Sequence, residues 1–140
     1  LAQMVKIHQF AIMAAPTMSQ YAGTMALKNG ASDVAMMRDS YNQRRRFLMA
    51  ELKRLGIPCF EPFGAFYIFP NISQFGLSSE EFATRLIREH KVAVVPGSAF
   101  GQSGEGFVRV SYAYSIDELK QAFERIEHFI TELRAEQGGK

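Results

Sequence analysis

The feature that most constrains the fold is an alternation of short apolar runs with amphipathic helical segments, which begins after Gly56. Residues 65–69 and 92–95 are almost wholly apolar, and over residues 107–112 Val108, Val110 and Tyr112 share one face while Phe107, Arg109 and Ser111 share the other. Runs of this length are typical of strands, whereas apolar residues every three or four positions are typical of helices. The alternation predicts an α+β fold, with a sheet of about three strands covered by two or three helices. Because residues 65–69 are apolar on both faces, that strand is expected to be central or covered on both sides.

The helices of this region carry their own start signals. Ser-x-x-Glu sequences at residues 78–81 and 115–118 fit the capping box, in which a hydroxyl and a carboxylate satisfy free backbone donors. The second helix continues with apolar residues on one face over residues 119–133. Residues 135–140 are expected to form a frayed tail.

A long helix over about residues 33–55 precedes the alternating region, with Asp33 as its expected N-cap. Arg44 and Arg45 interrupt its apolar stripe. The interruption fits a helix that bridges two domains, and it equally fits arginines that extend from the edge of a core. Residues 1–30 form two helical pieces with no strand to cover. The first piece has no N-cap and starts at Leu1, so we expect an excised part of a longer protein.

Composition excludes several classes of function. Sixteen basic residues nearly balance fourteen acidic ones, which gives no argument for a nucleic-acid or membrane partner. No apolar run approaches the roughly 20 residues that span a bilayer. Cys59 has no second cysteine to pair with, which favours a reducing compartment, and we expect a cytoplasmic protein.

Common catalytic motifs are also missing. His8, His90 and His128 are too widely spaced to suggest a metal site, and none is expected. The glycine-rich residues 97–106 lack the Gly-Lys-Ser/Thr ending of a phosphate-binding loop and are expected to be a flexible connection between strands.

Three motifs remain, and they follow one another in a fixed order. They are Pro62-x-Gly64-Ala65-Phe66-Tyr67-x-Phe69-Pro70, Val94-Val95-Pro96-Gly97-Ser98-Ala99-Phe100-Gly101 and Val108-Arg109-Val110-Ser111-Tyr112-Ala113. Together they resemble the C-terminal part, the small domain, of the fold-type I, pyridoxal-phosphate-dependent aminotransferases of class I/II, the aspartate and aromatic aminotransferase group. The resemblance covers the chain to about Leu133.

The resemblance assigns Arg109 to the α-carboxylate of an amino-acid substrate, which a planar guanidinium can grip with two hydrogen bonds. The strand pattern alone also allows an ordinary arginine on a solvated sheet face. Gly64, Ala65 and Phe66 are placed by resemblance near the substrate pocket, although a simple entry into a strand explains them equally well.

The resemblance also implies a division of the chain. Residues 1–30 would be the severed tail of the large cofactor-binding domain, and residues 31–140 would be the small C-terminal domain with its long linking helix. The lysine that binds pyridoxal 5'-phosphate lies upstream in this family. No catalytic, cofactor-binding or metal-binding residue is therefore assigned to this chain, and the chain alone is expected to be inactive and not covalently bound to the cofactor.

The parent is expected to exchange an amino group between an amino acid and a 2-oxo acid. Its expected partners are this small-molecule substrate, the missing large domain and a second copy in a homodimer, with no nucleic acid and no membrane. Two alternatives stay open. One is a pyridoxal-phosphate-dependent lyase or synthase of the same fold, and the other is a stand-alone α+β binding or oligomerisation module.

Overall fold

The computed structural model describes residues 1–11 and 14–139, and their contacts divide the chain into two compact units, Leu1–Asp39 and Ser40–Lys140. The helix α3 (Ala31–Arg54) runs through this division. It begins before Asp33, which lies in its first turn and is not the N-cap that the sequence suggested. The assignment of residues 1–30 and 31–140 to two domains stays a prediction.

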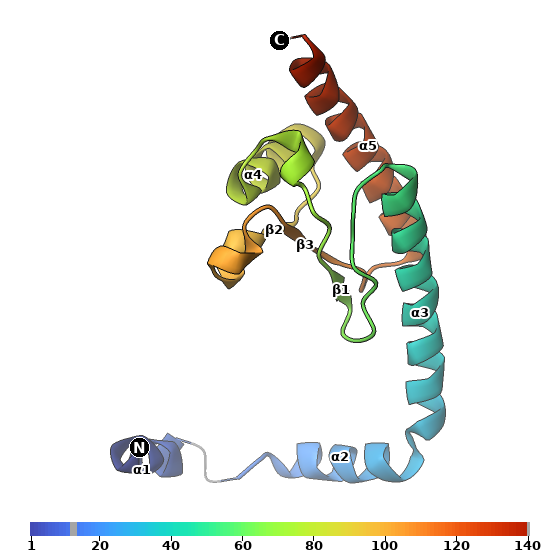
Figure 1. The fold of residues 1–140 in the computed structure, drawn as a ribbon. Helices are drawn as coiled ribbons and strands as arrows, with labels where there is room; N and C mark the ends of the chain where they lie inside the picture. The colour runs from blue at the N-terminus through green and yellow to red at the C-terminus, as the bar shows by residue number, and fades with distance from the viewer. Residues whose placement is uncertain (12–13, 140) are drawn as a thin grey trace. The chain divides into compact units, whose positions relative to one another are not determined.

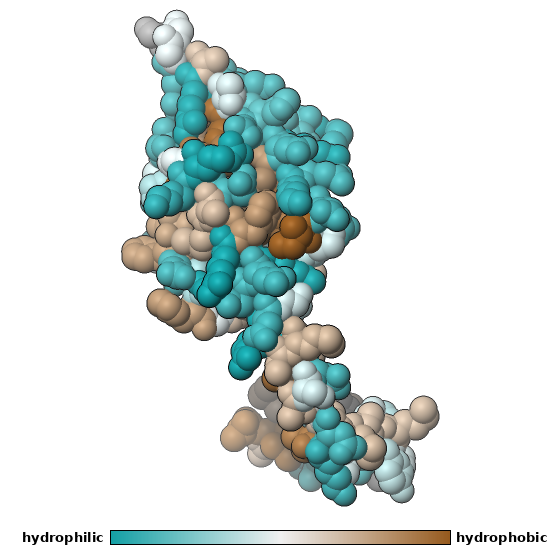
Figure 2. Space-filling view, turned by 90° about the vertical axis from the view of Figure 1, so that its right-hand side faces the viewer, coloured by the Kyte–Doolittle hydropathy of each residue, from teal (hydrophilic) through white to brown (hydrophobic). Residues whose placement is uncertain are grey.

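The first unit consists of α1 (Ala2–Ala11), α2 (Thr17–Asn29) and the start of α3. Neither α1 nor α2 has a buried residue, and large apolar side chains such as Phe10 and Leu27 are each 91% exposed. Figure 2 shows apolar and polar side chains mixed over the visible face of these helices. In the part of the chain that the structure describes, no helix is both long and apolar enough to cross a membrane.

The second unit is built around an antiparallel sheet in the order β1-β3-β2 (Figure 1). The strands are β1 (Tyr67–Ile68), β2 (Val95–Pro96) and β3 (Val108–Ser111). β3 pairs with both neighbours, so that Ser111 lies opposite Tyr67 and Arg109 lies opposite Val95. The predicted α+β class and the small three-stranded sheet are confirmed.

The prediction for the strand at residues 65–69 is wrong in length and in position. β1 contains only Tyr67 and Ile68 and lies at an edge of the sheet. Ala65 has φ +59°, a left-handed conformation that a strand cannot continue through, and Phe69 is 37% exposed. The aromatic residues that looked like strand core therefore lie partly in solvent.

The strand predicted at residues 92–95 is also displaced. Lys91 adopts φ +60° at the end of the preceding helix, and the chain reaches the sheet only at Val95. β2 includes Pro96, which is compatible with an edge strand because proline has no N–H to donate to a second neighbour.

Two amphipathic helices cover the sheet, and both begin where the sequence indicates. In α4 (Ser79–His90) the N-cap Ser78 accepts a hydrogen bond from the Glu81 N–H, and α5 (Ile116–Gly138) has a complete capping box. The predicted tail from residue 135 is wrong, because α5 stays helical to Gly138. Glu136 in this last part of α5 forms an ion pair with Arg85 of α4 at 2.8 Å.

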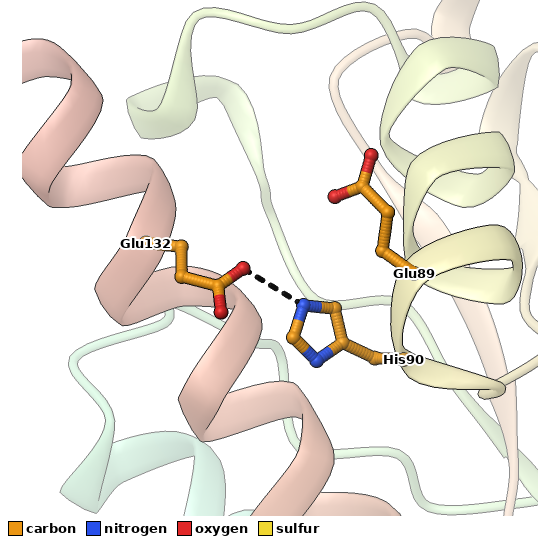
Figure 3. Close-up of side chains that lie close together, drawn as sticks. All are labelled: Glu89, His90 and Glu132. Carbon is orange, nitrogen blue, oxygen red and sulfur yellow. Dashed lines mark hydrogen bonds and ion pairs between the residues drawn. The ribbon is translucent and has the colours of Figure 1, made fainter.

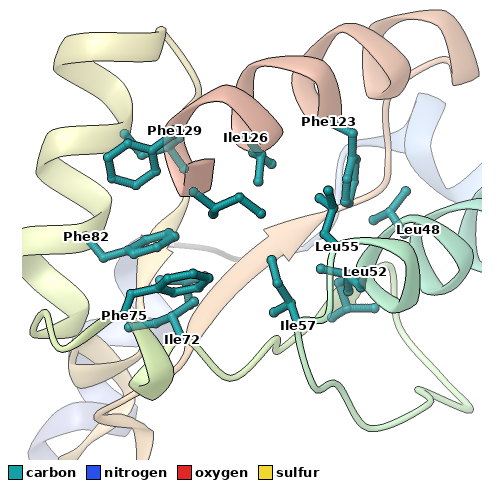
Figure 4. Packing of buried hydrophobic residues seen from close by; sticks show 14 of the residues in the cluster. Leu48, Leu52, Leu55, Ile57, Ile72, Phe75, Phe82, Phe123, Ile126 and Phe129 are labelled. Carbon is teal, nitrogen blue, oxygen red and sulfur yellow. The ribbon is translucent and has the colours of Figure 1, made fainter. Parts of the chain in front are cut away.

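The core lies between α3, α4, α5 and the inner face of the sheet, as the packed side chains in Figure 4 show. Short 3-10 turns complete the unit: η1 (Ser73–Phe75), η2 (Gly97–Phe100) and η3 (Gln102–Gly104). Val108 of β3 and Tyr112, which directly follows the strand, are each only 2% exposed, so one face of this segment is fixed in the core. The alternation of residues 107–112 therefore turns Arg109 to the opposite face.

Candidate functional site

Arg109 lies in the middle of the central strand β3, half-buried, on the face of the sheet that points away from the core. Its guanidinium carbon is 4.5 Å from the centre of the Tyr67 ring and 5.0 Å from the centre of the Phe100 ring. Both contacts are in the range of cation–π interactions. The two rings hold a rigid, planar cation on a rigid strand.

The Arg109 guanidinium has no acidic partner and no hydrogen bond to protein among the residues described. Arg54 and Arg85, by contrast, each bind two carboxylates, and those bonds raise the pKa of both guanidinium groups. A half-buried cation without a counter-charge has all its donors available, so the geometry suits an anionic ligand.

The turn before β1 is connected to the same site. The Ala65 carbonyl accepts a hydrogen bond from the Tyr112 hydroxyl at 2.9 Å, and the Phe66 carbonyl accepts one from the Tyr112 N–H at 2.9 Å. Burial raises the pKa of the Tyr112 hydroxyl, so it remains a proton donor at neutral pH. The Phe66 ring lies 4.2 Å from the Tyr67 ring, which contacts Arg109.

Of the predicted site residues near this turn, Phe66 is linked to Arg109 through the Tyr67 ring, whereas Gly64 and Ala65 have no described contact with Arg109. Gly64 has open space where a side chain would be, so packing within this chain does not require glycine there. Tyr67 and Phe100 are the residues that sequence reasoning missed. Tyr67 had a usable signal, because it stands in the same motif as Gly64, Ala65 and Phe66.

A cavity of about 430 Å³, whose mainly aromatic lining also includes Glu61, shares two of its lining rings with the Arg109 site. Tyr67 and Phe100, the rings that contact Arg109, also line this cavity. Other members of its lining are Phe60, Phe69 and Phe107. The site therefore combines a guanidinium that has no acidic partner among the residues described with a mainly apolar cavity, whose acidic lining residue Glu61 is bound by Arg45.

A second cluster of side chains joins α4 to α5. His90 Nε2 lies 3.0 Å from Glu132 Oε2, and Glu89 lies close by, as Figure 3 shows. Sequence spacing could not reveal this group, because its members come from two helices. Glu89 is already bound by Arg85 at 3.1 Å. The nearby guanidinium opposes a metal ion, and we assign this cluster to the packing of the two helices.

The lysines of the second unit that the structure describes do not form a cofactor site with Arg109. Lys91 Nζ donates to the Arg88 carbonyl at 2.7 Å, and Lys120 lies 3.6 Å from Asp117 in the first turn of α5. Lys53 lines a separate cavity beside Cys59. Lys91 and Lys120 are thus each close to a neighbouring oxygen, and the cavity that Lys53 lines contains neither Tyr67 nor Phe100.

Known proteins with sequences similar to this chain are aminotransferases. Residues 1–126 match the family described as aminotransferase class I and II. YugH of Bacillus subtilis (strain 168) is 51% identical over 127 residues, which are 91% of this chain and 33% of YugH. Aromatic-amino-acid aminotransferase 2 of Thermococcus litoralis is 45% identical over 132 residues, which are 93% of this chain and 34% of the relative.

Solved structures show the same relationship. The crystal structure of an aromatic aminotransferase from Pyrococcus horikoshii matches with a TM-score of 0.88 and 42% identity, over 95% of this chain and 36% of that chain. This chain therefore spans about a third of the length of the proteins it matches.

Proposed function

Because this chain belongs to the class I and II aminotransferases, we propose that it is the part of such an enzyme that binds the α-carboxylate of the substrate through Arg109. The single observation that supports this role is that the guanidinium is held by Tyr67 and Phe100 and has no acidic partner among the residues that the structure describes. A carboxylate can accept two parallel hydrogen bonds from a guanidinium, which fixes its position and its orientation.

The proposed parent transfers an amino group between an amino acid and a 2-oxo acid, and it uses pyridoxal 5'-phosphate, as members of this family do. The cofactor supplies the electron-accepting chemistry. The role of this chain is to orient the substrate, and orientation of a bound reactant contributes to the rate. Gly64, Ala65 and Phe66 are proposed to border the substrate, because their turn is joined to Arg109 through Tyr67.

The proposal includes a second copy of the parent as partner in a homodimer and a cytoplasmic location. It also states that the 140-residue chain alone has no transaminase activity, because in this family the cofactor-binding lysine lies upstream, and the described lysines of the second unit have other neighbours than Arg109. Borohydride reduction in the presence of pyridoxal phosphate should leave no stoichiometric adduct at one lysine. A single site-specific adduct would refute this part of the proposal.

The decisive test is Arg109→Ala in the full-length enzyme that contains this chain. Loss of two charge-assisted hydrogen bonds is expected to cost roughly 3–5 kcal/mol of transition-state binding, on the order of 10²–10⁴ in kcat/KM. Arg125→Ala is the matched control, because Arg125 is an exposed arginine on α5. Equal kinetics of the Arg109 and Arg125 variants with an ordinary α-amino acid would refute the assignment.

A further inference from the structure

The loop between β2 and β3 carries one of the two rings that contact Arg109. Phe100 stands at the end of η2, and Figure 1 shows the turns of this loop, in orange, beside α4. The Phe100 ring touches the Phe69 ring edge-to-face at 5.5 Å but is 49% exposed. Since core packing does not enclose this ring, its place over Arg109 depends on the loop that carries it.

One carboxylate fastens this loop to α4. Glu105 Oε1 accepts a hydrogen bond from the Ser79 N–H at 2.7 Å, and Glu105 Oε2 accepts one from the Ser79 hydroxyl at 2.8 Å. Ser79 is the first residue of α4, where free N–H groups and the helix dipole favour a negative charge. These bonds lower the pKa of the Glu105 carboxyl, so the group is ionised at neutral pH.

The same serine holds the other end of the loop. Ser79 is fully buried, and its hydroxyl oxygen also accepts a hydrogen bond from the Ser98 N–H at 3.3 Å. Ser98 precedes Phe100 by two residues, and Glu105 follows it by five. A single buried hydroxyl therefore ties both sides of the Phe100 turn to the start of α4.

The ends of the loop are also packed directly on each other. A side chain at Gly97 would come within 1.9 Å of the Gly104 carbonyl oxygen, and the Gly97 N–H donates to the Phe107 carbonyl at 2.8 Å. The predicted connection between two strands is present, and its two ends are packed on each other. The loop is a closed unit, and its attachment to α4 sets where the whole unit lies.

We propose that Glu105 is a positioning residue, whose carboxylate clamps the loop to α4 and thereby holds Phe100 against the Arg109 guanidinium. The inference rests on the proposed function of Arg109 and extends it to a residue that does not touch the substrate. Loss of the clamp weakens the orientation of the guanidinium in the ground state and the transition state alike, so it raises KM and leaves kcat nearly unchanged.

Glu105→Gln in the full-length enzyme tests the clamp, because glutamine keeps the size of the side chain and removes its charge. KM for the amino-acid substrate is expected to rise about two- to fivefold, the change that corresponds to one cation–π contact, with kcat within about twofold. Glu118→Gln is the matched control. Glu118 makes the same bonds to a serine at the start of α5, away from the Phe100 loop, and its variant is expected to keep the wild-type KM.

A double-mutant cycle separates positioning from a general structural role. If the clamp acts through Phe100, Glu105→Gln has no further effect on KM in a Phe100→Leu background. Equal effects in both backgrounds overturn the inference, as does an unchanged KM in Glu105→Gln alone. Arg109→Ala, measured in parallel, separates the role of Glu105 from the role of Arg109. If Arg109→Ala raises KM and Glu105→Gln does not, the inference about Glu105 is wrong. If Arg109→Ala has no effect on the kinetics, the proposed function of Arg109 is wrong.

Discussion

Arg109→Lys separates charge from shape at the proposed carboxylate site. Lysine keeps the positive charge on a flexible stem, but it lacks the planar fork that can bind both carboxylate oxygens in parallel. The lysine ammonium also presents no flat surface to the rings of Tyr67 and Phe100, which lie 4.5 Å and 5.0 Å from the Arg109 guanidinium. The substitution therefore tests whether the site recognises a carboxylate through two parallel hydrogen bonds or through positive charge alone.

The magnitude follows from these contacts. One charge-assisted hydrogen bond is worth about 1.5–3 kcal/mol, and the weakened ring contacts add up to roughly 1 kcal/mol. The sum, about 2–4 kcal/mol, corresponds to a loss on the order of 30- to 10³-fold in kcat/KM. Arg109→Lys should thus lower kcat/KM less than Arg109→Ala does, and far more than a substitution on the surface does.

The assay is steady-state kinetics of the full-length enzyme with a panel of L-amino acids and a fixed 2-oxo acid, with Arg125→Lys as control. The loss should appear with every amino acid of the panel, since the α-carboxylate is their common group. A kcat/KM within about threefold of wild type for Arg109→Lys would mean that charge alone suffices, and it would refute the argument from the planar fork.

Three further tests concern the fold. Phe129 is fully buried and packs edge-to-face on a neighbouring phenylalanine, so Phe129→Leu should lower the free energy of unfolding in urea by about 1–3 kcal/mol. The same change at the exposed Phe100 should alter it by less than about 0.5 kcal/mol, and equal losses would contradict this account of the core. Ser115→Ala should lower the free energy of unfolding, measured in urea in the same way, by about 0.5–2 kcal/mol. The bonds from Ser115 also lower the pKa of the Glu118 carboxyl, so the part of the loss that depends on this carboxylate is present at neutral pH and disappears as the pH falls through the lowered pKa. Burial raises the pKa of the Cys59 thiol, so iodoacetamide should alkylate it more slowly at neutral pH than free cysteine, and an equal rate would count against this burial.

Sequence was sufficient where the signal is local. The capping box at Ser115 needs only two side chains within one turn, and it is present as predicted. The alternation of residues 107–112 fixed which side of β3 is buried, because a strand has a period of two. The class of fold, the three strands and the family resemblance followed from such local patterns and their order.

Sequence was insufficient where partners are distant in the chain. The contact of Phe100 with Arg109 depends on a bond between Ser79 and Glu105, which are 26 residues apart. The pair of His90 with Glu132 likewise joins two helices. Strand lengths were overestimated because apolar composition does not reveal a single left-handed residue such as Ala65.

The half-buried position of the Arg109 guanidinium has an energetic consequence. A half-buried guanidinium loses part of its hydration, and most buried charges offset this loss with a protein counter-charge. Arg54 and Arg85 do so with two carboxylates each, whereas Arg109 has only the faces of two aromatic rings among the residues described. A ligand that brings a negative charge to Arg109 can therefore gain the electrostatic free energy that a carboxylate of the protein would otherwise supply. Locally unsatisfied charges are expected at functional sites, so the absence of a protein partner argues for a carboxylate supplied by the substrate.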